Sequence, residues 1–336
     1  MRKEWLARSI VVVLLAAAVV VPAGAWWQRS QGAVIHARMA ETGGWTPENL
    51  TAVVGEPLHL RLTSDDVTHS FAIGQSAQEP VDVLPGEISE ITLVFDKPGK
   101  YTFYCTRWCS INHWRMRGVI EVTGPGTPTQ EASPPLYVTL GLDIDAEHHA
   151  ETIPLQKPSA QRGAALGRDI PAAYRSREAY LTNTPLELWQ ALRADPALAD
   201  LSVQETWDLV AFAWQLNITR QEIETGRSLY ATNCAACHGE QGGGDGVFAD
   251  QLASPGEGGH AEMTGGQATA GQMTVRPTDF TASEHMLAAS PAHLQGKIIR
   301  GGMGTGMPYW GPIFTEEQTW ALVAYLWTFQ FQMEEP

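Results

Sequence analysis

The chain has 336 residues, enough for two or three domains. Hydrophobic residues make up 44% and charged residues 18%, which provides for packed cores and excludes a chain that is disordered as a whole. The formal net charge is −15, and no basic footprint of the kind that nucleic-acid binding needs is visible. Four cysteines are too few for a fold that depends on disulfides.

An uncharged, mainly aliphatic stretch lies near the N-terminus and follows three basic residues. This stretch, residues 9–28, has about the length that a helix needs to cross a bilayer, and the basic flank predicts that its N-terminus stays inside the cell. Small residues at 23–25 leave a cleaved signal peptide as the alternative. We interpret residues 1–28 as a membrane anchor or signal segment. Either way, the bulk of the chain is expected on the extracytoplasmic side of the cell membrane.

Residues 51–123 have the pattern of a small β-sandwich. Turn signals containing Pro-Gly separate short runs that alternate or are rich in β-formers, at 58–62, 91–95, 101–104 and 119–122. The composition of residues 124–135, GPGTPTQEASPP, is that of a linker.

Beyond the linker the periodicity is helical, and part of the sequence is repeated. Residues 201–214 match residues 314–327, with shared Thr-Trp and Leu-Val-Ala words. Thr184 and Ser290, each followed by proline, open a second pair of matching helices. Residues from about 175 to 216 are therefore expected to copy the end of the C-terminal domain.

A group of soft metal ligands lies between two predicted strands: Cys105, Cys109, His113 and Met116. His69 follows an earlier strand. Two thiolates, two imidazoles and a thioether suit copper, but a mononuclear blue-copper site uses only one Cys. Two coppers bridged by both thiolates, each with one His, are the economical solution. A zinc site held by two Cys and two His, or a Cys-x3-Cys disulfide, are the alternatives.

The run VDVLPGEISEITLVFDKPGKYTFYCTRWCSINHWRMRGVIEV, residues 81–122, resembles the copper domain of cytochrome c oxidase subunit II; nitrous oxide reductase carries a similar domain. The resemblance covers about residues 50–123. It implies a cupredoxin domain, assigned to residues 29–123, with a CuA-type dinuclear copper centre. The ligands that it implies are His69, Cys105, the backbone carbonyl of Arg107, Cys109, His113 and Met116.

The sequence departs from that family at two positions. The family often has an acidic residue where Arg107 stands and glycine where Ser110 stands. A carbonyl ligand does not depend on its side chain, so the site is expected to form. The guanidinium of Arg107 would change the local charge.

Cys234-Ala235-Ala236-Cys237-His238 is the attachment motif of a covalent haem c. The two thiols, Cys234 and Cys237, would bind the haem and His238 its iron; a redox or zinc Cys-x2-Cys is the alternative. The second axial ligand is expected downstream, at Met303 or Met307. The Gly-Thr-x-Met-Pro word around Met307 resembles class I cytochromes c, which favours Met307. This resemblance spans about residues 221–330, and we assign residues 219–336 to a class I cytochrome c domain.

Residues 136–218 contain no cysteine, so no haem can attach covalently there. We interpret them as a degenerate, haem-less cytochrome c-like half-domain that serves as a structural spacer. His148 and His149 stand in an acidic stretch and leave open a non-covalent haem or a surface metal site. A solvated loop is the main expectation for them.

The sequence thus predicts a multidomain protein: an N-terminal membrane helix, a β-sandwich, then an all-α cytochrome c-like region. It offers no acid–base pair or nucleophile, which indicates a redox subunit rather than an enzyme by itself. We expect electrons to pass from an external donor through haem c and the copper centre to the catalytic membrane subunit of a haem-copper terminal oxidase. An electron-entry subunit of a nitric oxide reductase of the same superfamily and a free periplasmic shuttle are the alternatives. Residues 221–336 carry 4 Lys and Arg against 13 Asp and Glu, which favours a basic donor.

Overall fold

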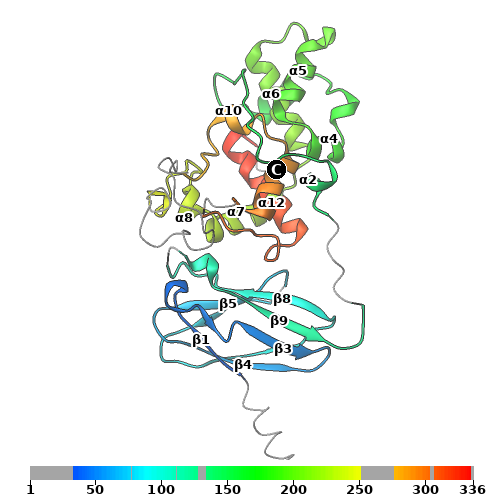
Figure 1. The fold of residues 1–336 in the computed structure, drawn as a ribbon. Helices are drawn as coiled ribbons and strands as arrows, with labels where there is room; N and C mark the ends of the chain where they lie inside the picture. Colours follow the sequence, from blue (N-terminus) through cyan, green and yellow to red (C-terminus); the bar gives the residue numbers. More distant parts are fainter. Residues whose placement is uncertain are drawn as a thin grey trace, which may run out of the picture. The chain divides into compact units, whose positions relative to one another are not determined.

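The computed structural model describes residues 33–76, 78–110, 112–127, 134–250, 276–302 and 306–333. The chain divides into two compact units, Met1–Glu131 and Ala132–Pro336 (Figure 1). The predicted anchor, residues 1–28, lies outside the described residues. Within the described part of the chain, no helix is long and apolar enough to span a membrane.

Two sheets form the first unit (Figure 1). Their strands are β1 (Ala33–Ala37), β2 (Trp45–Thr46), β3 (Asn49–Val53), β4 (Leu58–Ser64), β5 (His69–Ile73), β6 (Val81–Val83), β7 (Ser89–Leu93), β8 (Gly99–Tyr104) and β9 (Arg117–Thr123). One sheet has the order β2-β1-β4-β7 and the other β3-β9-β8-β5-β6. Strand β1 runs parallel to β4 and β3 parallel to β9, whereas β8 pairs antiparallel with both β5 and β9. The predicted β-sandwich is confirmed.

Alternation of apolar residues places the core between the sheets. In β4, Leu60 and Leu62 are buried while His59 is exposed, as a period of two requires. The rings of Phe71 and Phe103 stack with centroids 5.2 Å apart. Strand β9 passes this pair at Gly118, where a methyl group would lie 2.1 Å from the Phe103 ring. Only glycine therefore lets β9 approach β8 this closely.

One predicted strand is shorter in the structure. Residues 91–95 were expected to continue as a strand, but β7 ends at Leu93. The carbonyl of Phe95 instead accepts a hydrogen bond from the amide of Gly55 at 2.9 Å, in the turn between β3 and β4. The chain thus leaves the β4 ladder after Leu93.

The second unit is helical (Figure 1). Its helices are α2 (Leu136–Thr139), α3 (Ala160–Ala165), α4 (Arg177–Thr182), α5 (Pro185–Ala194), α6 (Val203–Gln215), α7 (Arg220–Asn233), α8 (Ala235–His238), α10 (Ser283–Met286), α11 (Pro291–Arg300) and α12 (Glu316–Gln330). Short 3-10 turns in the two units are η1 (Ala40–Thr42), η2 (His113–Arg115), η3 (Ala172–Tyr174) and η4 (Pro196–Leu198). The predicted all-α region is confirmed.

Hydrogen-bonding residues cap the repeated helices where the sequence predicted them. Ser202 and Thr315 form capping boxes at the starts of α6 and α12. Thr184 forms another at α5, and the Ser290 side chain caps α11. Proline occupies the first turn of both α5 and α11, where its missing N–H costs nothing.

The repeat extends further toward the N-terminus than the sequence predicted. Helix α3 packs on α6 through Gly163, where a methyl group would lie 2.1 Å from the carbonyl oxygen of Asp208. Helix α7 packs on α12 through Gly226, where it would lie 2.0 Å from the carbonyl oxygen of Ala321. Asp208 and Ala321 occupy the same position in the matched segments. Helix α3 therefore packs on α6 at the same position of the repeat at which α7 packs on α12.

The two helix pairs pack together within the second unit. The rings of Trp214 in α6 and Trp327 in α12, at matched positions of the repeat, lie 5.9 Å apart and nearly perpendicular.

Other segments of the second unit also join its earlier and later parts. Asp145, before α3, accepts hydrogen bonds from Lys297 at 2.9 Å and from Arg300, both in α11. The amide of Ala160 donates to the carbonyl of Gln332 at 2.9 Å.

Candidate metal centres

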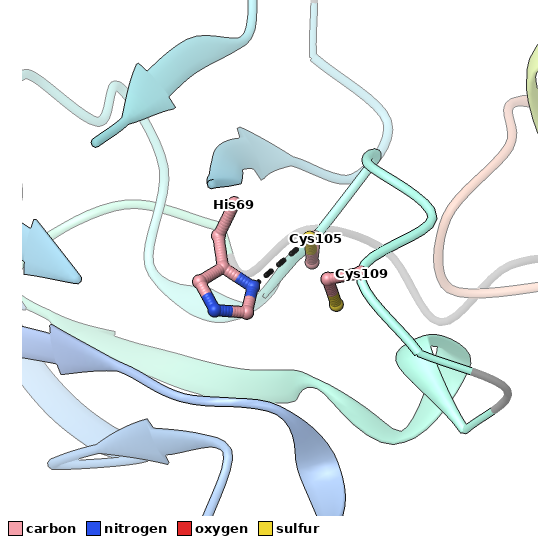
Figure 2. Close-up of side chains that lie close together, drawn as sticks. All are labelled: His69, Cys105 and Cys109. Carbon is pink, nitrogen blue, oxygen red and sulfur yellow. Dashed lines mark hydrogen bonds between the residues drawn. The ribbon is translucent and has the colours of Figure 1, made fainter. Parts of the chain in front are cut away.

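The first candidate centre lies at one end of the sandwich, where β5 begins and β8 ends. His69 is the first residue of β5, and Cys105 directly follows β8. Because β5 and β8 pair antiparallel, with Ala72 opposite Tyr104, the ladder brings these two side chains together. Ligand atoms of His69, Cys105 and Cys109 all lie within 4.8 Å of one another. Figure 2 shows His69 facing the segment that carries the two cysteines.

A carboxylate fixes the orientation of the His69 ring. Its Nε2 lies 2.7 Å from Oδ1 of Asp66, and its Nδ1 lies 3.9 Å from Sγ of Cys105 (Figure 2). Asp66 is itself held by the backbone N–H groups of Met39 and Val67, at 2.7 and 2.6 Å. Burial alone would lower the pKa of His69, but hydrogen bonding to Cys105 and Asp66 outweighs it and raises the pKa. A ring anchored at one nitrogen presents the other to a metal.

Two further predicted ligands, Met116 and the carbonyl of Arg107, each lie beside one of the two thiols. Sγ of Cys109 lies 3.3 Å from Sδ of the fully buried Met116, and Sγ of Cys105 lies 3.3 Å from the carbonyl oxygen of Arg107. The carbonyl of Met116 accepts from the amide of Cys105 at 3.1 Å and from Nε1 of Trp45 at 3.0 Å. Strand β2, through Trp45, thus helps to hold the loop that carries the thioether.

The thiols differ in acidity because they interact. The contact with Cys109, together with the nearby imidazoles of His113 and His69, lowers the pKa of Cys105 to about 3 against the opposing effect of burial. The same contact and burial raise the pKa of Cys109. One thiolate therefore forms readily, and a cation bound at the site would stabilise the second. All four cysteines of the chain are free thiols, so the Cys105–Cys109 disulfide alternative is not what the structure contains.

His113, on η2, is a buried imidazole whose two ring nitrogens are unpaired. It is 2% exposed, and neither Nδ1 nor Nε2 has a hydrogen-bond partner. Its ring lies 4.0 Å from that of Trp108, and it is near enough to lower the pKa of Cys105. Leaving a buried polar group unpaired costs about 1–3 kcal/mol. A metal ion beside the thiols would satisfy this ring, so these residues fit a soft metal.

The second candidate centre lies at the junction of α7 and α8. Cys234 follows α7, and α8 carries Cys237 and His238. Burial raises the pKa of Cys234 to about 12 and that of Cys237 to about 11, so both stay protonated thiols. The hydroxyl of Tyr230 donates to the carbonyl of Gly239 at 2.7 Å and fixes the turn after the motif.

The His238 ring is oriented by two neighbours. Its Nδ1 lies 3.1 Å from the carbonyl oxygen of Thr278, and Phe280 stacks on it with centroids 4.7 Å apart. Burial lowers the pKa of His238, which keeps the ring neutral. A neutral imidazole that donates from Nδ1 has Nε2 free as a ligand. The motif therefore fits a covalently held haem.

Met307 lies in a loop that returns to α11. Its carbonyl accepts from the amide of Gly302 at 3.1 Å. Gly301 has φ of +72°, and a methyl group on it would lie 2.6 Å from the backbone of Pro308. The amide of Trp310 then donates to the carbonyl of Ile298 at 3.1 Å. Both ends of the loop are thus fixed to α11; Met303 lies outside the described residues.

The histidines of the acidic stretch contact helices of the second unit. The His148 ring lies 4.5 Å from that of His293 in α11, and the His149 ring 6.0 Å from that of His285 in α10. Nδ1 of His148 lies 3.2 Å from the carbonyl of Ala146. In the described residues, His69, Cys105 and Cys109 form the one group of three or more ligands close enough to hold a metal.

Sequence reasoning assigned no role to the residues that orient these ligands. Asp66, Trp45 and Thr278 contact a ligand ring or a ligand's backbone in the structure. Asp66 alone carried a local signal, because it stands three residues before His69. The other two reach their partners only through tertiary packing.

The first unit is a cupredoxin-type sandwich with a thiolate, imidazole and thioether cluster at one end. The second unit is helical and carries a haem-attachment motif. Comparison with known families agrees: residues 46–123 match the family described as Cytochrome C oxidase subunit II, periplasmic domain, and residues 223–330 match Cytochrome c. The chain therefore contains a cytochrome c oxidase subunit II periplasmic domain and a cytochrome c domain.

Related proteins match the first of these domains. Cytochrome c oxidase subunit 2 of Thermus thermophilus is 34% identical over 79 residues, which are 24% of this chain and 58% of the relative. The subunit 2 of Apis mellifera ligustica is 39% identical over 67 residues, 20% of this chain and 29% of the relative. The solved periplasmic domain of subunit II of cytochrome oxidase (CoxB) of Bradyrhizobium japonicum is 25% identical, with a TM-score of 0.22, over 23% of this chain and 54% of that one. The chain thus spans about half or less of the length of these relatives.

Proposed function

We propose that this chain is the membrane-tethered electron-transfer subunit of a haem-copper terminal oxidase. It would pass electrons from an external donor, by way of a covalent haem c and a CuA-type dinuclear copper centre, to a catalytic membrane subunit that reduces oxygen. The observation that carries the proposal is the presence, in one chain, of the cluster of His69, Cys105 and Cys109 in an oxidase subunit II domain and of Cys-x2-Cys-His in a cytochrome c domain.

The copper ligands that we propose are those implied by the resemblance to oxidase subunit II: His69, Cys105, the carbonyl of Arg107, Cys109, His113 and Met116. The proposal is supported by the unpaired nitrogens of the buried His113 and by the thioether 3.3 Å from Cys109. Thioethers are soft ligands that favour copper, whereas zinc sites use thiolate, imidazole and carboxylate. Bound copper would supply reversible one-electron exchange. The protein's own part is to hold the ligands in a rigid sandwich so that little rearranges.

For the haem, we propose thioether attachment at Cys234 and Cys237, with His238 and Met307 as axial ligands. The proposal is supported by the Nδ1 contact of His238 with Thr278, which leaves Nε2 available. It is also supported by the hydrogen bond from the Gly302 amide to the Met307 carbonyl, just beyond the end of α11. Phe280 and Thr278 hold the imidazole plane. Residues 219–336 would form this cytochrome c domain.

We further propose that residues 1–28 tether or export the chain, that residues 29–123 form the copper domain, and that residues 124–135 link it to the helical part. Residues 136–218 would be the haem-less half-domain, a redox-inert spacer. Its derivation from a cytochrome c fold is supported by the matched crossings of α3 with α6 and α7 with α12. An extracytoplasmic location for the bulk of the chain is supported by the match of residues 46–123 to a periplasmic domain.

The donor is proposed to be basic. Residues 221–336 have 4 basic against 13 acidic residues, so their field repels an acidic partner and steers a basic one. Association with a basic cytochrome should weaken as ionic strength rises, because salt screens exposed charges. Binding that is insensitive to salt would contradict this part of the proposal.

Native purification from membranes through a C-terminal tag tests the function. The reduced complex is mixed with O2 and, separately, with NO, while reoxidation of haem c is followed optically. Rapid reoxidation by O2, in a complex that contains a polytopic haem protein, is the expected result. Reoxidation by NO with little response to O2 would assign a nitric oxide reductase instead. A chain that purifies alone and responds quickly to neither gas would be a free shuttle.

A further inference from the structure

The segment between the two cysteines is tethered at two successive residues. The amide of Thr106 donates to Oγ of Ser70 at 2.9 Å, and the two hydroxyls also hydrogen-bond to each other. The next residue, Arg107, donates from Nε and Nη2 to Asp82 at 3.1, 2.9 and 2.7 Å. Such a bidentate guanidinium–carboxylate pair fixes direction as well as distance.

The two residues that hold the cysteine segment, Ser70 and Asp82, are directly paired across the β5–β6 ladder. Strands β5 and β6 pair antiparallel, with Ser70 opposite Asp82 and His69 opposite Val83. The two anchor residues therefore lie beside each other, next to a proposed copper ligand. A shift of the cysteine segment relative to His69 would have to break both contacts.

These two contacts hold the stretch of backbone that contains the carbonyl oxygen of Arg107. The carbonyl oxygen of Arg107 accepts from the amide of Cys109 at 2.8 Å and lies 3.3 Å from Sγ of Cys105. Because this group belongs to the main chain, its direction depends on the conformation of the segment rather than on a rotamer. The Arg107 side chain, anchored on Asp82, constrains that conformation.

We propose that Asp82 is a positioning residue for the copper centre: by holding the Arg107 guanidinium, it fixes the carbonyl of Arg107 relative to the two thiols. The inference rests on the proposed dinuclear copper centre. Both side chains are about half exposed, 56% for Arg107 and 49% for Asp82, so the pair contributes little to stability. Its effect is on ligand geometry.

The test uses the full-length, metal-loaded chain with Asp82→Ala, Asp82→Glu and a matched control, Glu90→Ala. Glu90 lies 3.6 Å from Arg61 in an exposed ion pair across the β4–β7 ladder. This ladder belongs to the other sheet of the unit, not to the sheet that carries β5, β6 and β8. The readouts are copper per chain, copper affinity, and the copper hyperfine pattern in electron paramagnetic resonance. Asp82→Ala is expected to lower copper affinity about tenfold and to alter the hyperfine pattern. Asp82→Glu should restore part of both, and Glu90→Ala should change neither.

Two further variants distinguish a positioning role of Asp82 from an effect of its charge alone. They are Arg107→Met and the double variant Asp82→Ala with Arg107→Met. If Asp82 positions the segment, both single variants alter the hyperfine pattern and the double variant stays altered. If only charge matters, the single variants shift the copper reduction potential in opposite directions and the double variant returns to the wild-type value, which overturns the proposal. An Asp82→Ala spectrum and affinity identical to wild type would overturn it as well.

The wild-type spectrum separates this inference from the proposed function. Two coppers per chain that share one unpaired electron in wild type, with no response to Asp82→Ala, would remove only the role of Asp82. A wild-type chain that binds zinc or no metal at these cysteines would remove the copper centre itself.

Discussion

Oδ1 of Asp66 lies 2.7 Å from Nε2 of His69, and this contact leaves Nδ1 of the same ring facing Sγ of Cys105 at 3.9 Å. The carboxylate therefore decides which nitrogen is available to a metal. Hydrogen bonds from His69 and from two backbone amides lower the pKa of Asp66 despite the opposing effect of burial, so it stays ionised in this role.

Asp66→Asn is expected to lower copper affinity about tenfold, because the amide keeps an acceptor but loses the charge that stabilises the ring orientation. Copper affinity is measured by competition with a chelator of known strength. The matched control is Asp65→Asn, whose side chain pairs with His36 and Arg38 instead. Equal losses in the two variants would mean that the orientation of His69 does not depend on Asp66.

His113→Phe separates stability from metal binding. In the metal-free chain this change removes two unpaired buried nitrogens and keeps a ring beside Trp108, so the first unit should lose no stability or gain about 1 kcal/mol. Adding copper to wild type should raise the unfolding midpoint, since a ligand that binds only the folded state stabilises it. The variant should lose most of that increment.

Thermal unfolding with and without copper measures both effects, and His59→Phe on the exposed side of β4 is the control. Strong destabilisation of the metal-free variant would show that His113 has a structural role independent of metal.

The sequence identified the ligands more readily than their supports. The close spacing of Cys105, Cys109 and His113 indicates a metal site, because thiols and imidazoles are the side chains that bind soft metals. Trp45 shares no such signal: its indole donates to the carbonyl of Met116, a residue distant in the chain. That contact exists only because the two sheets stack, which no local pattern encodes.

Helix α3 was missed for a related reason. It has six residues, too few for a clear apolar period, and Gly163 in its middle disfavours a helix by about 1 kcal/mol. The same glycine lets α3 lie against the backbone of α6. Its helical state depends on tertiary packing, so only the later part of the repeat was visible from sequence.

Gly163→Ala and Gly226→Ala test the two helix crossings. An added methyl group would lie about 2 Å from a backbone carbonyl in each case, which forces the helices apart and should cost about 1–3 kcal/mol. Ser228→Ala, on the exposed face of α7, is the control and should be neutral or slightly stabilising.

Denaturant unfolding followed by circular dichroism gives the stability of each variant, and the haem absorption spectrum reports the haem domain. Gly226→Ala should affect both measurements. Gly163→Ala should lower stability while the haem spectrum of the folded chain stays unchanged. A Gly163→Ala chain as stable as the Ser228→Ala control would mean that the α3–α6 crossing does not form.

Met307→Ala distinguishes the two candidate axial methionines. Loss of the axial thioether should lower the haem reduction potential and abolish the absorption band of sulfur-ligated ferric haem, because the thioether stabilises the ferrous state. Met303→Ala is the matched control and should keep both properties. The opposite result would transfer the ligand role to Met303.

The lowered pKa of the partly buried His293 predicts that the second unit loses stability at acid pH. Burial, with the nearby His148 and Lys297, lowers the pKa of His293 to about 4, although Asp145 and Asp143 oppose the shift. The unfolded chain takes up this proton near pH 6.5, so stability is present above that pH and is lost as the pH falls toward 4. The side chain is partly exposed, so the loss from this residue is about 1 kcal/mol between pH 7 and 4.5. The measurement is the unfolding midpoint against pH for wild type and His293→Gln; the variant should lose less stability over this range, and parallel curves would show that His293 does not contribute.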